Sequence, residues 1–359
     1  MNKQRIDRLR NKMLGDGRKA ALVTSPENRL YFSGFKGSSG ILFITAEEAY
    51  LLTDFRYMDQ AELEAPDLTV LNHDRKPYEA VAELVKKHGI REVGIEEGKL
   101  PLQEFRELES LNPDVNFFNS EPGVFELRMI KDDTEIANLK KGIAMCDAAF
   151  EHSLSFIRPG MSEKELGLEL EFFMRKAGAG GIKENHVIAT GPRASLPHGQ
   201  ATDRIIEVGD WVKMDIGAKV EGYYTDFTRT VVLGEPTDKQ VEIYNIVKRT
   251  QEAALAAIGP GKTCSELDAL ARGIIADAGY GENFGHSLGH SIGLAVHESP
   301  AMRATDHTVL EPGMVITVEP GIYIPGWGGV RIEDFLVITE DGYDNLTKAT
   351  KELQVIPVS

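Results

Sequence analysis

Apolar residues recur every three or four positions between residues 132 and 157, which is the spacing of one face of an α-helix. The recurring residues are Ile136, Leu139, Ile143, Cys146, Phe150, Leu154 and Ile157. Asp132 precedes them and Glu135 follows it by three positions, the arrangement of a capping box. A second helix is predicted to begin near Thr237, with Gln240 in the equivalent position. The second half of the chain therefore contains two long helices.

The residues before about position 120 follow a different pattern, in which β-rich runs alternate with helical stretches. The β-rich runs are residues 19–35, 40–54, 67–73, 92–98 and 114–120, and the helical stretches are 55–64, 77–88 and 101–110. The segment 118–133 contains a Pro-Gly break followed by charged residues, so it is the predicted linker. We therefore expect an α/β domain at 1–125 and a second domain at 130–359.

The second half of the chain contains an internal repeat. EVGDWVKMDIG at 207–217 aligns with EPGMVITVEPG at 311–321, which pairs Asp215 with Glu319. Upstream, PGMSEKEL at 159–166 matches PGKTCSEL at 260–267, and each reads as a capping box that opens a helix. The helices are expected to end at Ala177-Gly178 and Ala278-Gly279, where glycine suits a helix stop. Two such units, repeated after roughly 100 residues, would face each other across a pseudo-twofold axis.

Each copy of the repeat carries two acids in apolar surroundings. Asp226 follows Asp215, and Glu333 follows Glu319, on the returning segment of a hairpin. The turn near Lys219 to Gly222 predicts Asp215 and Asp226 opposite one another on an antiparallel pair, and the IPGWGG turn predicts the same for Glu319 and Glu333. Four unrelated surface acids are the competing interpretation. The matched positions favour convergence of the acids.

Clustered acids in a partly desolvated site either take up protons or bind cations. Four negative charges balance two divalent ions, and oxygen-rich ligands suit Mn²⁺, Co²⁺, Fe²⁺ or Zn²⁺ in a two-metal site. Histidines provide a nitrogen ligand. His286, His290 and His297 lie in the glycine-rich stretch NFGHSLGHSIGLAVHESP, and His198 lies in a comparable loop of the first repeat. A structural role in the core or in a loop remains the alternative for His198 and His297.

Composition excludes several classes of protein. The chain has 359 residues, of which 42% are hydrophobic, and its net charge is −16, which argues against a nucleic-acid surface. No stretch approaches 18 apolar residues, the opening segment has no apolar signal region, and the two cysteines do not suggest a disulfide framework. We therefore expect a cytoplasmic protein with neither membrane nor nucleic-acid partners. The motifs HExxH, GxxxxGK[ST] and GxSxG are absent, which leaves the hydrolytic two-metal interpretation.

The repeated acids and the glycine-rich histidine stretch resemble those of the pita-bread-fold metallopeptidases, whose proline-specific branch contains aminopeptidase P and prolidase. The resemblance covers the whole chain and implies an α+β architecture, with a smaller creatinase/prolidase-like α/β domain before a pita-bread catalytic domain with an internal pseudo-twofold repeat. The five metal ligands that it implies all have the expected type and order. They are Asp215 in VKMDIG, Asp226 in YTDFTR, His290 in GHSIG, Glu319 in VEPGIY and Glu333 in VRIED. Asp226 and Glu333 are implied to bridge two divalent ions, with Mn²⁺ the first choice.

The resemblance also implies an Xaa-Pro exopeptidase, in which the ions activate a water molecule that attacks the bond before proline. Glu319 resembles the proton shuttle, and His198 and His297 resemble substrate-contacting histidines that stabilise the oxyanion or hold the carbonyl. Arg331 of VRIED is typical of the proline-specific branch, and substrate contact and orientation of a site acid are equally open roles for it. We further place His286 and Tyr323 among the substrate-binding residues.

The expected substrates are small peptides with proline in second position, and the expected assembly is a homodimer. Three other functions compete with this prediction. The chain could be an aminopeptidase of the same fold without preference for proline, a creatinase-like hydrolase, or a binding module on an inactive peptidase scaffold. The five intact ligands argue against the last two, because creatinase lacks the metal set and a binding module does not need it.

Overall fold

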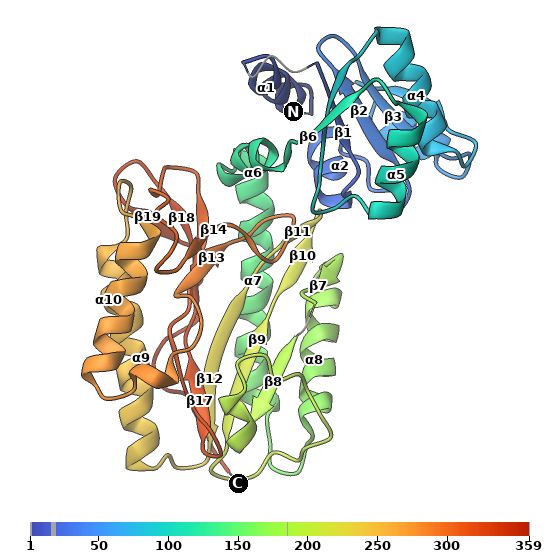
Figure 1. The fold of residues 1–359 in the computed structure, drawn as a ribbon. Helices are drawn as coiled ribbons and strands as arrows, with labels where there is room; N and C mark the ends of the chain where they lie inside the picture. The colour runs from blue at the N-terminus through green and yellow to red at the C-terminus, as the bar shows by residue number, and fades with distance from the viewer. Residues whose placement is uncertain (1, 16–18, 185, 359) are drawn as a thin grey trace. The chain divides into compact units, whose positions relative to one another are not determined.

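The computed structural model describes residues 2–15, 19–184 and 186–358. The chain divides into two compact units, Met1–Arg128 and Met129–Ser359, whose elements are labelled in Figure 1. Each unit has its own apolar core. Within the described ranges, no helix has the length and apolar character needed to cross a membrane.

The first unit is built on a six-stranded sheet in the order β4-β3-β2-β1-β5-β6. The strands are β1 (Ala20–Val23), β2 (Ile41–Thr45), β3 (Ala49–Thr53), β4 (Thr69–Asn72), β5 (Glu92–Ile95) and β6 (Asn116–Asn119). The pairs β1–β2 and β2–β3 are antiparallel, and β3–β4, β1–β5 and β5–β6 are parallel. The helices are α1 (Asn2–Gly15), α2 (Pro26–Ser33), α3 (Met58–Glu64), α4 (Pro77–His88), α5 (Leu102–Leu111) and α6 (Glu121–Met129). The predicted α/β character of this unit is confirmed.

One local prediction in this unit is wrong, and a second is only partly right. The β-rich run at 19–35 contains helix α2, because Ser25 caps the helix through the amide of Asn28, proline occupies the first turn, and Gly34 ends the helix in a left-handed conformation. The boundary between the two units lies within the predicted linker at 118–133, but the chain is not broken at the Pro-Gly pair, because helix α6 begins with Glu121 and continues through it. Proline in the first turn of a helix loses no hydrogen bond that the helix would have made.

The second unit contains two pairs of helices, α7 (Asp133–Phe156) with α8 (Glu163–Lys176) and α9 (Asp238–Ala257) with α10 (Cys264–Asp277). All four begin with a capping box, and the capping residues are Asp132, Ser162, Thr237 and Thr263. Ala177 and Ala278 are the C-cap residues of helices α8 and α10, and the glycine that follows each has a positive φ. The predicted starts and stops of these helices are confirmed.

Matching backbone contacts show that the repeat is structural. Ser162 forms an isolated bridge with Ile205, and Thr263 forms the equivalent bridge with Val309. The amide of Gly160 donates to the carbonyl of Ile206, and the amide of Gly261 donates to that of Leu310. In each repeat the loop before the helix is therefore tied to the segment that leads into the acidic hairpin. In Figure 1 the two helix pairs of this unit flank its strands.

The strands of the second unit form one sheet in the order β20-β12-β9-β8, another in the order β14-β13-β15-β18-β19, and two smaller ones, β11-β10-β7 and β16-β17. The strands of the first half are β7 (Gly181–Ile182), β8 (Val187–Thr190), β9 (Trp211–Ile216), β10 (Ala218–Val220), β11 (Tyr223–Tyr224) and β12 (Phe227–Leu233). Those of the second half are β13 (Gly289–Ser291), β14 (Glu298–Met302), β15 (Val315–Val318), β16 (Gly321–Ile324), β17 (Gly328–Arg331), β18 (Asp334–Ile338), β19 (Tyr343–Asn345) and β20 (Val355–Ile356). This is the predicted pita-bread arrangement.

Candidate metal centre

Asp215 and Asp226 lie on one face of the hairpin β9–β12, but they are not directly opposite one another. Asp215 pairs with Thr228, and the same register places Asp226 across from Gly217. The predicted direct opposition is therefore wrong by two positions, and the two acids are diagonal neighbours. Because side chains alternate between faces along a strand, both still point to the same side.

Glu319 and Glu333 come from the second hairpin. On one side of them Val318 pairs with Asp334, and on the other side Gly321 pairs with Arg331. This register brings Glu319 level with Glu333, as the turn between β16 and β17 predicts. The buried threonine Thr228 links the two hairpins, because its hydroxyl donates to Glu333 Oε2 at 2.7 Å.

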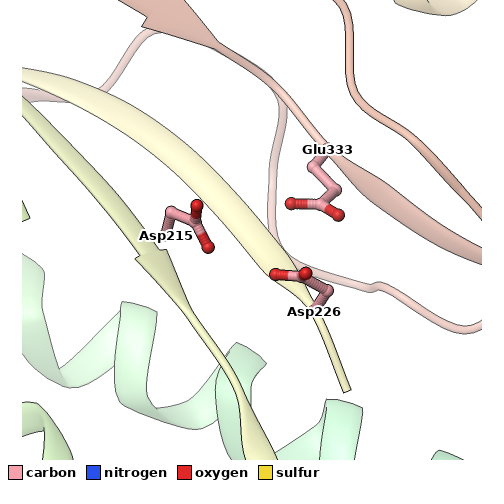
Figure 2. Close-up of side chains that lie close together, drawn as sticks. All are labelled: Asp215, Asp226 and Glu333. Carbon is pink, nitrogen blue, oxygen red and sulfur yellow. The ribbon is translucent and has the colours of Figure 1, made fainter. Parts of the chain in front are cut away.

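Three carboxylates from the two hairpins converge at the centre of the unit. Asp215, Asp226 and Glu333 each offer an oxygen atom within 4.8 Å of the others, and all three are buried. Figure 2 shows the three carboxylates close together, with Asp215 on β9, Asp226 directly before β12 and Glu333 directly before β18. Four unrelated surface acids would not be arranged in this way.

His290 on β13 lies beside this cluster. Its Nδ1 is 3.0 Å from the carbonyl oxygen of Ser291, so Nδ1 carries the proton and donates it. Nε2 is then left with a lone pair, and it lies 3.4 Å from Glu319 Oε1 and 3.7 Å from Asp226 Oδ2. A backbone carbonyl that orients a histidine in this way is a usual partner of a metal ligand. His290 can therefore serve as a nitrogen ligand.

The acids of the site fit divalent cations. Glu333 Oε1 is buried and accepts no hydrogen bond from any residue that the structure describes. Burial raises the pKa of Asp226 to about 6 and that of Glu319 to about 7, and burial together with Asp226 raises the pKa of Glu333 well above its ordinary value. A bound divalent cation would satisfy the Glu333 oxygen that lacks a donor, and it would offset the cost of ionising these buried carboxylates.

Arg331 is buried against the cluster. Its guanidinium donates to Asp215 Oδ2, to the hydroxyl of Thr228 at 3.1 Å and to the hydroxyl of Tyr323 at 2.8 Å. The Tyr323 hydroxyl is also 2.8 Å from Nε2 of His286. Three of the five side chains that the sequence proposed for substrate binding, His286, Tyr323 and Arg331, thus form one network that ends on Asp215. Because Arg331 contacts the carboxylate directly, the geometry favours its role in orienting the acid.

Lys183 contacts the cluster from the loop after β7, and the sequence analysis missed it. Its Nζ donates to Oδ1 of both Asp215 and Asp226. Burial alone would raise the pKa of Asp215, but the charges of Lys183 and Arg331 outweigh burial and hold it below its ordinary value. Nothing in the local pattern GGIKENH distinguishes this lysine from a solvated one, so no sequence signal could have identified it.

Lys213 is a second lysine that the sequence analysis missed. It is fully buried on β9, and its Nζ donates to the carbonyl oxygens of Ala194 and Leu196 at 3.0 and 2.6 Å. It therefore holds the loop that leads to His198. A signal was present in this case, because a lysine inside the apolar run WVKMDIG is rarely buried without specific partners.

His198 and His297 are the most accessible of the proposed site residues, since both are exposed. The ring of His297 lies 4.4 Å, centroid to centroid, from that of His290. Partial desolvation by the surrounding protein lowers the pKa of His297 to about 4, with His290 the next cause, and partial desolvation also lowers the pKa of His198. Both rings are thus neutral near pH 7, and both remain open to a bound molecule.

The chain is similar to known proteins over its whole length. Residues 137–340 match the model of metallopeptidase family M24, and residues 5–130 match that of the creatinase/prolidase N-terminal domain. The chain is 40% identical to the Xaa-Pro dipeptidase of Pyrococcus horikoshii, over 93% of this chain and 94% of that protein. The solved structure of Xaa-Pro dipeptidase from Bacillus anthracis superposes with a TM-score of 0.96 at 45% identity, covering 99% and 100% of the two chains. X-Pro aminopeptidase from Thermotoga maritima superposes with a TM-score of 0.89 at 39% identity, covering 95% and 98%.

Proposed function

This chain belongs to metallopeptidase family M24, and we propose that it hydrolyses the bond between the first residue of a peptide and a proline in second position. The observation that carries the proposal is the buried convergence of Asp215, Asp226 and Glu333, with one Glu333 oxygen left without a donor among the described residues. The similar proteins named Xaa-Pro dipeptidase and X-Pro aminopeptidase support the choice of substrate.

We assign the metal site to Asp215, Asp226, His290, Glu319 and Glu333. Four carboxylates and one imidazole nitrogen would hold two divalent ions, and this donor set suits Mn²⁺. When bound, such ions lower the pKa of a water molecule and polarise the carbonyl of the scissile bond. The identity of the metal, the number of ions and a homodimeric assembly are all parts of the proposal.

Glu319 is the acid best placed to move a proton. Its side chain is 14% exposed, whereas those of Asp215 and Asp226 are 6% and 4% exposed. Its carboxylate is therefore the most open of these three to a bound peptide. A carboxylate whose proton affinity is raised by burial can take a proton from the attacking water and release it to the leaving imino nitrogen of proline.

The accessible histidines are placed to bind substrate. His297 lies beside His290, and His198 follows a loop that Arg331 contacts through the carbonyl of Pro197 at 3.2 Å. Neutral imidazoles can donate a hydrogen bond to the carbonyl oxygen of the scissile bond as its negative charge develops. The hydrogen-bonded network of Tyr323, His286 and Arg331 would help to hold the site in place, because it ends on the proposed ligand Asp215.

A panel of peptides tests the substrate. Proline lacks an amide hydrogen, so a site that tolerates it cannot depend on a backbone donor at that residue. We expect turnover of Ala-Pro and of Ala-Pro-Gly with Mn²⁺, and much slower turnover of Ala-Ala and Ala-Ala-Gly. The ratio of kcat/KM for the dipeptide and the tripeptide separates a dipeptidase from an aminopeptidase. Equal rates on proline and alanine peptides would contradict the proposed specificity.

His297→Ala tests whether this histidine acts in catalysis or in folding. If it stabilises the charge that develops in the transition state, kcat should fall by roughly 100-fold, the loss that follows removal of one oxyanion donor. Bound metal and the thermal midpoint should hardly change, because the side chain is exposed and the proposed ligand is His290. Unchanged kcat with a lowered thermal midpoint would instead show that His297 is structural.

A further inference from the structure

The ammonium of Lys183 contacts Asp215 and Asp226 at the same time. Its Nζ donates to one oxygen of each carboxylate, and its side chain is only 9% exposed. Asp215 and Asp226 are also two of the three acids that form the buried cluster. The ammonium of Lys183 therefore already neutralises part of the negative charge of Asp215 and Asp226 that a divalent ion would neutralise.

The contact is built into the fold. The amide of Lys183 donates to the carbonyl of Gly217 at 2.7 Å, which fixes its backbone beside strand β9. A Cβ at Gly217 would come within 2.1 Å of the carbonyl oxygen of Thr225, and it would also collide with this lysine, at 2.8 Å from Lys183 Cβ and 3.2 Å from its Cδ. Gly217 lies across from Asp226 in the register. The missing side chain thus leaves a path along which Lys183 reaches both acids.

The sum of the charges at the site also indicates that Lys183 takes the place of part of the charge of one divalent ion. The four acids assigned to the site carry four negative charges when ionised, and Lys183 and Arg331 return two positive charges through their contacts with Asp215 and Asp226. The remaining two negative charges equal the charge of one divalent ion. A second ion would have to bind without charge compensation, or to displace the ammonium of Lys183.

We propose that Lys183 is a resident cation that competes with one of the two divalent ions for the position beside Asp215 and Asp226. The inference rests on the proposed function insofar as that function places metal at these acids. The protein would then bind one ion tightly, through Glu319 and Glu333 of the second hairpin and His290 of β13. The second ion would bind more weakly, because Lys183 must first leave both carboxylates.

Metal binding to Lys183→Met tests the proposal, because methionine has a similar length and no charge. The full-length protein is freed of metal by chelation and dialysis, and Mn²⁺ alone is titrated by calorimetry, with elemental analysis after equilibrium dialysis. In the wild type we expect one tight ion and one weak ion. In Lys183→Met the weak ion should bind roughly ten- to a hundredfold more tightly, the range over which groups around a metal ligand tune affinity.

Stability provides a second readout. Without metal, Lys183→Met should have a lower thermal midpoint than the wild type, because two buried carboxylates lose their shared cation. Saturating Mn²⁺ should then raise the midpoint of the variant more than that of the wild type. Lys219→Met is the matched control, since Lys219 lies on the adjacent strand β10 and its Nζ donates to the hydroxyl of Tyr224 at 3.0 Å. This control should bind Mn²⁺ as the wild type does.

The outcomes separate this inference from the proposed function. If wild type and Lys183→Met bind two ions with the same affinities, Lys183 does not compete and the inference is wrong, while the metallopeptidase proposal stands. If neither protein binds Mn²⁺, the proposed metal site fails together with the inference. If Lys183→Met does not fold, Lys183→Gln is titrated in its place and judged by the same comparison of affinities.

Discussion

Removal of divalent metal is expected to abolish peptidase activity, and Mn²⁺ or Co²⁺ is expected to restore it. The loss should be nearly complete, because the buried carboxylates and the neighbouring imidazole of His290 are groups that would act by holding ions, and the ions would activate the attacking water. The measurement is turnover of an Xaa-Pro dipeptide after dialysis against a chelator, and then after each ion is added back, with bound metal determined by elemental analysis.

The thermal midpoint supplies the control for this experiment. Ligands that bind only the folded state stabilise it, so adding Mn²⁺ to the metal-free protein should raise the midpoint along with the activity. A metal-free protein that remains folded and inactive shows that the loss of turnover is chemical. Full activity in a sample shown to contain no metal would refute the two-metal proposal outright.

Neutralising either proposed bridging acid, by Asp226→Asn or Glu333→Gln, is expected to lower kcat by orders of magnitude. Each change keeps the shape of the side chain and removes a charge that both ions would share. The fold should survive, because the burial of both carboxylates raises their pKa and thus disfavours the ionised form in the metal-free protein. The measurements are kcat, bound metal and thermal midpoint for each variant.

Asp334→Asn is the contrasting control for these variants. Asp334 is the residue after Glu333 and is equally buried, but its oxygens are paired with Arg229, Asn345 and Lys351 at 2.8 to 3.0 Å. Its replacement should lower the thermal midpoint while the bound metal is retained. Near-normal turnover of Asp226→Asn or Glu333→Gln with both ions bound would show that the bridge has been assigned to the wrong residues.

The helix boundaries of the second unit were predictable because the signals that set them are local. A capping residue and its partner lie three positions apart, as Ser162 and Glu165 do, and they satisfy amides that no other part of the helix can reach. The repeat was predictable for a related reason. Copies of one backbone arrangement keep the same glycines, and Gly209 and Gly313 both adopt the positive φ that the loop before each acidic hairpin requires.

Local signals failed where two of them conflicted. The run at 19–35 is rich in apolar and aromatic residues, which favours a strand, but Ser25, Pro26 and Gly34 set the ends of a helix. The Pro-Gly pair of the predicted linker suggested a break, but proline is tolerated in the first turn and α6 continues through Gly123. In both segments the residues at the helix ends determined the structure more strongly than the average composition did.

The sequence by itself determined the fold class, the helix ends of the second unit and the repeat, because each depends on spacings within one element or one repeat, and it supplied the acids and histidines of the proposed site. Only the tertiary structure decided the register that makes Asp215 and Asp226 diagonal neighbours. It also decided which cationic side chains, Lys183 and Arg331, form ion pairs with these acids. Lys183 lies 32 and 43 residues from these acids, and Arg331 lies 116 residues from Asp215. No periodicity relates residues so far apart. Their charges meet because strand pairing brings distant segments together in a site from which water is excluded.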